Sequence, residues 1–145
     1  MTKKILILVT FAFVFLTKLY AQQDLSKFMV IGNKTGMNSV SIKELRKIFK
    51  GKYTNWSNGE TVTIVLPSPK TNNAELVAKI IYQTSVPSMQ KYWLSLVFQG
   101  RFSPPIFTDS DLETVQQVQK FPGAIGVVDI NTTGIPRGFI IQVTP

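Results

Sequence analysis

Ser41-Ile-Lys-Glu-Leu-Arg-Lys-Ile-Phe-Lys-Gly51 is the stretch on which the fold prediction depends. It begins with a capping box, in which the serine hydroxyl accepts a bond from a free backbone N–H and Glu44 reaches back toward the helix start. Its apolar residues fall on one helical face, and the final glycine ends the helix. An apolar run at 28–31 precedes the stretch, and a β-branched run at 61–66 follows it. The pattern predicts a helix between two buried strands.

The same alternation continues toward the C-terminus. Further helices are predicted from residue 72, over 89–98 and from residue 111, and further strands over 124–128 and 139–143. Strands interleaved with helices, without repeats or low-complexity tracts, favour a layered α/β domain with a largely parallel or mixed sheet. No internal linker is visible, so residues 22–145 are predicted to form one domain.

Residues 1–21 have the three parts of a secretory signal peptide. Two lysines form the positive segment, residues 5–16 are an apolar and hydroxyl run, and Ala21 supplies a small residue at the predicted cleavage point. An uncleaved membrane anchor is the alternative. A spanning helix needs about 20 apolar residues, and this run is shorter. Cleavage is therefore predicted, which makes residues 22–145 a periplasmic or secreted domain.

Loss of the signal changes the charge. Three lysines leave with it, so 13 basic residues face 8 acidic ones and the net charge falls from +8 to +5. This mild excess, together with export, argues against nucleic acid as a partner and favours a small anion or an anionic envelope surface. The basic residues are scattered singly, apart from one cluster: Lys43, Arg46, Lys47, Lys50 and Lys52.

The residue types present limit the chemistry. The chain has no cysteine, which excludes disulfides and a lipid-modified cysteine, so a soluble product is expected, with the membrane involved only during export. It also has no histidine, which excludes imidazole catalysis and histidine metal sites. Glu44, Glu75 and Glu113 are explained as helix-start partners, and Asp111 as a favourable first-turn charge. No enzyme, cofactor or metal site is predicted.

Aromatic side chains offer a possible stacking surface for a sugar or a base. Tyr92, Trp93 and Phe98 lie on a predicted helix together with other apolar residues. Packing in the core is therefore the prediction for these three.

The predicted binding segment joins the second strand to the second helix and reads Val65-Leu-Pro-Ser-Pro-Lys-Thr-Asn-Asn-Ala74. A helix start carries free N–H groups and the positive end of the helix dipole, which together favour an anion. The candidate ligands are side chains that donate hydrogen bonds or supply positive charge: Ser68, Lys70, Thr71, Asn72 and Asn73. The alternative is that Thr71 or Asn72 only caps its own helix.

Three segments resemble, in order and spacing, the phosphate-type periplasmic substrate-binding proteins of bacterial ABC transporters. They are Ser41–Trp56, the Lys91–Arg101 stretch with its following Pro-Pro, and Phe121-Pro-Gly-Ala-Ile-Gly-Val-Val-Asp129. The resemblance implies a type II periplasmic-binding-protein fold, a mixed sheet flanked by helices, with the ligand held at helix N-termini. Full-length members have two lobes, so this chain resembles a short, single-lobe member.

The binding loop departs from that family's pattern. The family loop looks like Arg-x-x-Gly-Ser-Gly-Thr, whereas residues 66–74 lack the arginine and both glycines. Only Ser68 and Thr71 keep comparable hydroxyls, and Lys70 is a point cation instead of a bidentate fork. Two functions remain open. One is a periplasmic solute-binding protein that holds a small anion such as phosphate. The other is a ligand-free adaptor that keeps the fold and binds an envelope transporter or sensor.

Overall fold

The computed structural model describes residues 25–145, and the predicted signal at 1–21 lies outside this range. The elements follow in this order: β1 Phe28–Gly32, β2 Ser39–Ser41, α2 Ile42–Phe49, β3 Thr63–Pro67, α3 Asn72–Val77, a π-helical turn Ala78–Tyr82, α4 Val86–Phe98, β4 Ile106–Thr108, α5 Asp111–Lys120, β5 Ala124–Asp129, a 3-10 turn Arg137–Phe139 and β6 Ile140–Thr144.

The six strands form one mixed sheet in the order β2-β6-β1-β5-β3-β4. β3 runs parallel to both of its neighbours, β5 and β4, whereas β1 runs antiparallel to β5 and β6. Because β3, β4 and β5 point the same way, their carboxyl ends meet at one edge of the sheet. The last residues of these strands are Pro67, Thr108 and Asp129.

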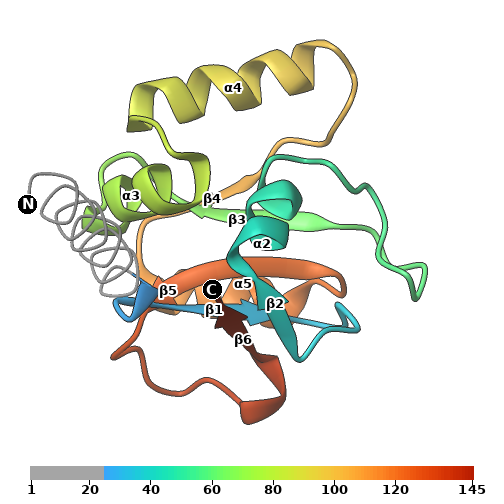
Figure 1. Cartoon of the computed structure of the whole chain (residues 1–145), viewed down its shortest axis with the longest axis vertical. Helices are drawn as coiled ribbons and strands as arrows, with labels where there is room; N and C mark the ends of the chain where they lie inside the picture. The colour runs from blue at the N-terminus through green and yellow to red at the C-terminus, as the bar shows by residue number, and fades with distance from the viewer. Residues whose placement is uncertain (1–24) are drawn as a thin grey trace, which may run out of the picture.

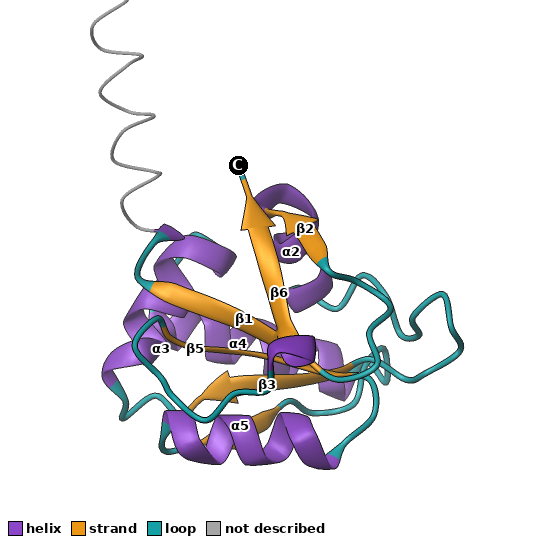
Figure 2. Cartoon of the chain, turned by 90° about the horizontal axis from the view of Figure 1, so that it is seen from below, coloured by secondary structure: helices purple, strands orange, loops and turns teal. Residues whose placement is uncertain are grey.

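Helices cover both faces of the sheet: α2, α3 and α4 lie on one side and α5 lies on the other (Figures 1 and 2). The first side holds the larger core, in which Phe49 and Trp93 are buried. The second side buries Val115 and Val118 of α5. The central strand β5 is apolar on both faces because both are covered. The predicted layered α/β fold with a mixed sheet is confirmed.

Helix α2 forms as predicted, but only one of the two hydrogen bonds of its capping box is made. The Ser41 hydroxyl accepts from the backbone N–H of Glu44 at 3.2 Å. The Glu44 carboxylate does not reach back. It accepts instead from Lys47 Nζ at 2.8 Å and from the Tyr53 hydroxyl at 2.5 Å. The Lys47 bond, followed by the Tyr53 bond, lowers the pKa of Glu44.

Three predicted core positions are wrong: Tyr92 is 37% exposed, and Phe98 and Leu112 are exposed too, although the spacing of three shared with Val115 and Val118 predicts that Leu112 faces the core. Leu112 is 66% exposed, because α5 turns Thr114, Val115 and Val118 to the sheet. Three-residue steps rotate by about 60° each around a helix, which carries Leu112 off the buried face. Phe98, at the end of α4, is 85% exposed. The short strands β2 and β4 were not predicted as strands, because three residues are too few to show a period.

Candidate functional site

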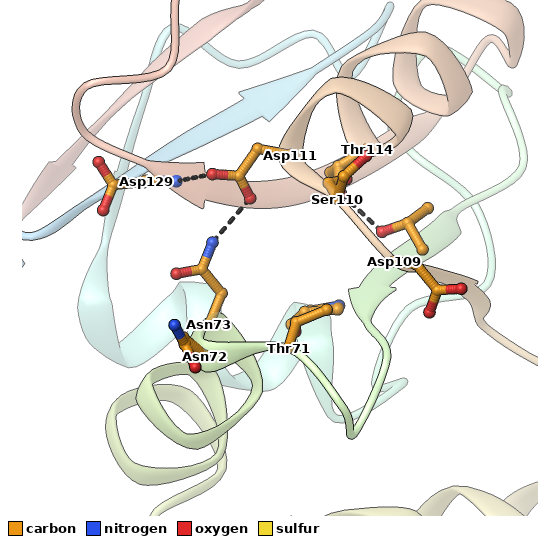
Figure 3. Close-up of a pocket in the computed structure, with 10 residues that line it drawn as sticks. Thr71, Asn72, Asn73, Asp109, Ser110, Asp111, Thr114 and Asp129 are labelled. Atoms are coloured by element: carbon orange, nitrogen blue, oxygen red, sulfur yellow. Dashed lines mark hydrogen bonds between the residues drawn. The ribbon is translucent and has the colours of Figure 1, made fainter.

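A polar cavity of about 340 Å³ lies at the carboxyl ends of β3, β4 and β5. Figure 3 shows the start of α3 on one side of it and the start of α5 on the other. The lining residues come from the β3–α3 connection, the β4–α5 connection and the end of β5: Pro67, Thr71, Asn72, Asn73, Thr108, Asp109, Ser110, Asp111, Thr114 and Asp129.

The topology of the sheet creates this cavity. The neighbouring strands β3 and β4 are parallel, yet α3 leaves β3 toward one face and α5 leaves β4 toward the other. Where connections diverge in this way, a crevice opens outside the strand ends, and α/β proteins hold ligands in such crevices. The cavity is therefore in the position that the fold favours for a binding site.

Asp111 joins the two sides of the cavity. Its Oδ1 accepts from the Asn73 amide at 2.7 Å, and its Oδ2 accepts from the Asp129 backbone N–H and from the Thr132 hydroxyl, both at 3.0 Å. Figure 3 shows Asn73 and Asp111 pointing toward one another, while the Asp129 carboxylate points away from them. The sequence interpretation of Asp111 as only a first-turn charge is incomplete, because this carboxylate ties α3, α5 and the end of β5 together.

We expect Asp111→Asn to lower the free energy of unfolding by about 2 kcal/mol, because one of the two oxygens becomes an NH₂ group that faces other donors. The control is Asp109→Asn, in which an exposed carboxylate is changed in the same way. That control should cost less than about 0.5 kcal/mol. Urea unfolding measures both, and equal losses in the two variants would contradict the bridging role.

Two buried hydroxyls support the β4–α5 connection beneath the cavity. Thr108 Oγ1 and Thr114 Oγ1 lie 2.6 Å apart, and both residues are almost fully buried. The Thr114 hydroxyl also lies within bonding distance of the Ser110 carbonyl, at 3.1 Å. The N-cap of α5 is Ser110, whose Oγ accepts from the Glu113 N–H at 3.2 Å. These bonds fix the start of α5.

The structure brings together three of the five predicted site residues. Thr71, Asn72 and Asn73 line the cavity, whereas Ser68 and Lys70 do not. Lys70 is exposed. The Thr71 hydroxyl donates to the Ser68 carbonyl at 2.8 Å and makes no capping bond, although Thr71 occupies the N-cap position of α3. A side-chain cap at Thr71, which the sequence left open, is therefore not formed.

The groups left available in the cavity differ from those predicted. Within residues 25–145, the Asn72 amide and the Asp109 carboxylate have no hydrogen-bond partner. Ser110 accepts a bond and keeps its own hydroxyl hydrogen. The first N–H groups of each helix also have no partner within their helix. The cavity therefore offers donors from two helix starts and an acceptor at Asp109.

The charge of the cavity was not anticipated. Asp109, Asp111 and Asp129 line it, and no lysine or arginine does. Within residues 25–145, no group of acidic residues is placed to hold a metal ion. Sequence reasoning did not place these aspartates together, because β4 was not predicted as a strand beside β3. The available signal was the polar Thr108-Asp109-Ser110 run, which ends a strand parallel to β3.

The comparisons with known proteins are consistent with this architecture. A family model described as a PBP superfamily domain matches residues 25–139. The chain belongs to the PBP superfamily. A comparison with curated proteins found no match. Within residues 25–145 of this PBP superfamily chain, no helix is long and apolar enough to span a membrane.

Solved structures share the fold of this PBP superfamily chain. PstS from Borrelia burgdorferi is 15% identical with a TM-score of 0.57. An ABC-type phosphate transport receptor from Vibrio cholerae is 14% identical with a TM-score of 0.51, and a phosphate binding protein from Stenotrophomonas maltophilia is 16% identical with a TM-score of 0.57. Each match covers 81% of this chain but only 47%, 46% and 39% of the other chain, respectively. The chain thus spans less than half the length of these structures.

Proposed function

We propose that this chain is a solute-binding module that holds a small oxyanion in the cavity between α3 and α5. The observation that carries the proposal is the convergence of two helix starts on one polar cavity at the ends of parallel strands. Helix starts favour anions, since their free N–H groups and dipoles point at the ligand. Because one structure of similar fold is named a phosphate binding protein and another a phosphate transport receptor, phosphate is the first anion to test.

The aspartates restrict which anion can enter. A fully ionised anion would be repelled by Asp109, which has no hydrogen-bond partner within residues 25–145. An oxyanion that keeps an acidic hydrogen can donate that hydrogen to the carboxylate instead. Phosphate keeps such a hydrogen at neutral pH and sulfate does not. We therefore expect the cavity to prefer phosphate to sulfate.

The proposal includes export to the periplasm, on the strength of the signal pattern at residues 1–21. A module of this kind would deliver its solute to an envelope transporter or sensor. A single lobe covers its ligand from one side only, so the affinity of the isolated chain should be modest. We propose binding and no catalytic role.

Asn72→Asp should weaken phosphate binding, measured by calorimetry, by about tenfold or more. The new carboxylate stands at a helix start, where it favours the helix but repels an anion. The fold is expected to persist, because Asn72 is exposed and has no side-chain partner within residues 25–145. Melting curves of both proteins should confirm that they are equally folded.

The matched control is Lys70→Ala, which makes the same change in net charge. Lys70 is exposed and does not line the cavity, so its loss should weaken binding less than about threefold. Absence of heat with phosphate in the unsubstituted protein would overturn the proposed function. So would equal losses in the two variants. Equal affinity for sulfate would contradict the selectivity assigned to Asp109.

A ligand-free adaptor is the second candidate, and one observation favours it. Leu94 and Phe98 lie one turn apart on α4 and are 54% and 85% exposed, and neighbouring exposed apolar side chains can form part of a contact surface. If calorimetry finds no anion, an envelope protein that binds the intact chain and is lost on Phe98→Asp would support this alternative.

A further inference from the structure

A second cavity, of about 440 Å³, lies between the end of α2 and α4 and shares no lining residue with the first. We call it the basic cavity, because Lys47, Lys50 and Lys52 line it from α2 and the following loop, and Arg101 lines it from the segment after α4. Its volume falls within the range of about 300–1,000 Å³ that is usual for small-molecule sites.

The positive charge of the basic cavity is largely unbalanced. Lys47 pairs with Glu44, with Nζ and Oε2 2.8 Å apart. Lys50, Lys52 and Arg101 form no ion pair within residues 25–145, and no carboxylate lines the cavity. The Lys52 ammonium lies 5.5 Å from the centre of the Tyr53 ring, a contact that leaves its charge in place. Three cations without an ion pair therefore line one cavity, and the nearby Glu44 carboxylate balances only part of their charge.

Cations near the end of a helix can also serve the helix itself. Here the backbone N–H groups of residues 50, 51 and 52 already donate to carbonyls of the last turn of α2, at 3.0, 3.0 and 3.1 Å. The Lys50 carbonyl accepts from the Tyr92 hydroxyl at 2.5 Å. The ammonium groups are therefore not needed to satisfy these carbonyls.

The walls of the basic cavity are held in place. The bond from Tyr92 to the Lys50 carbonyl ties α4 to the loop after α2. The Tyr92 ring packs edge-on against Tyr82 and Trp93, with ring centres 6.2 Å apart in each pair. Partial burial raises the pKa of Tyr92, and the nearby Arg101 guanidinium opposes the rise. Tyr92 thus stays protonated as the donor, with Arg101 close to its hydroxyl.

We infer that the basic cavity binds a soluble anion carrying several phosphoryl groups, such as a short polyphosphate. Three unpaired cations match an anion of more than two negative charges, and a guanidinium can hold two phosphate oxygens at once. The exposed apolar residues Leu94 and Phe98 fall on the side of α4 opposite Tyr92, by helical periodicity. A flat lipid surface could not touch both sides, which favours a soluble ligand.

The test is calorimetry of the full chain with sodium tripolyphosphate at low and physiological salt. We expect binding that weakens as salt rises, and a loss of about tenfold or more on combining Lys50→Gln with Lys52→Gln. The control combines Lys43→Gln with Lys120→Gln, which removes the same charge from exposed positions outside the cavity. The control should lose less than about threefold.

This inference is independent of the function proposed for the first cavity. Asn72→Asp should leave tripolyphosphate binding unchanged, and the Lys50→Gln/Lys52→Gln variant should leave phosphate binding in the first cavity unchanged. No binding by the unsubstituted protein, or equal losses in both double variants, would overturn the inference. It would also fail if Asn72→Asp removed tripolyphosphate binding, or if vesicles of phosphatidylglycerol bound the chain and tripolyphosphate did not compete.

Discussion

Gly123→Ala is expected to remove most of the stability of this protein, with a loss of about 4–6 kcal/mol. The backbone at Gly123 has a φ of +81°, and a Cβ added there would lie 2.1 Å from the carbonyl oxygen of Thr61. A left-handed conformation costs a non-glycine residue about 1–2 kcal/mol, and a clash with backbone cannot be relieved by turning a side chain. The residue must therefore move.

Movement of Gly123 would break a junction of three segments. Its N–H donates to the Asn33 carbonyl at 2.7 Å, and its carbonyl accepts from the Thr63 N–H at 3.1 Å and from the Trp56 indole N–H at 2.8 Å. Each lost bond adds about 0.5–1.5 kcal/mol. Urea unfolding measures the loss, and a protein near the lower end of the usual stability range of about 5–15 kcal/mol would then be close to unfolding.

Gly134→Ala is the control for backbone strain. Gly134 has a similar φ of +79°, but nothing lies within 4 Å of the place where its Cβ would stand. This variant should lose only the conformational cost, about 1–2 kcal/mol. If both variants lost the same amount, the contact with Thr61 would not be the cause.

Trp93→Ala should give the second largest effect, about 3–5 kcal/mol, because it empties the centre of the larger core. Trp93 is 2% exposed and packs edge-on against Phe102 with ring centres 5.4 Å apart. Its indole N–H donates to the Tyr82 hydroxyl at 2.7 Å, which donates to the Phe49 carbonyl at 2.7 Å. Burial raises the pKa of Tyr82 far above its usual value, so this hydroxyl stays protonated.

Tyr82→Phe separates hydrogen bonding from packing in the same cluster. It keeps the ring but leaves the Trp93 N–H and the Phe49 carbonyl without partners, which should cost about 2–3 kcal/mol. The control on α4 is Phe98→Ala, which removes an 85% exposed ring and should change stability by less than about 0.5 kcal/mol. A large loss for Phe98→Ala, or none for Tyr82→Phe, would contradict this account of the core.

Local pattern was sufficient for most of the fold. The capping serines at Ser41 and Ser110 mark the starts of α2 and α5 because their hydroxyls bond N–H groups three residues later, a contact that depends on nearby sequence alone. The apolar runs of β1, β3 and β5 were also recognised, since covered strands are almost continuously apolar. The Glu113 carboxylate also reaches back to the start of its helix, where it accepts from the Asp109 N–H at 2.7 Å. The partner of Glu44 was not predicted, because its carboxylate bonds Tyr53, which lies beyond the helix.

Part of the candidate site was also within reach of the sequence. The start of α3 was predicted, and Thr71, Asn72 and Asn73 do line the cavity. Its other side was not predicted, because β4 has only three residues and shows no period. Because β4 was not predicted, no pattern in the sequence places the start of α5 beside the start of α3. Asp111 was therefore interpreted as an ordinary first-turn charge.

By itself, the sequence determined the order and type of the main elements and the α/β class, because capping, turn formation and burial patterns act over a few neighbouring residues. The resemblance of three segments also indicated the superfamily that the chain belongs to.

Only the tertiary structure decided which side chains meet at the carboxyl ends of the strands. Asn73 and Asp111 are 38 residues apart in sequence and 2.7 Å apart in space. Parallel pairing of β3 and β4 brings them together. Strands that pair in this way can lie far apart in the sequence, so no periodic pattern in the sequence shows which residues will meet. For the same reason, the acidic lining of the first cavity becomes visible only in the folded chain, whereas the basic cluster around residues 43–52 was already visible in the sequence and the fold added Arg101 to it.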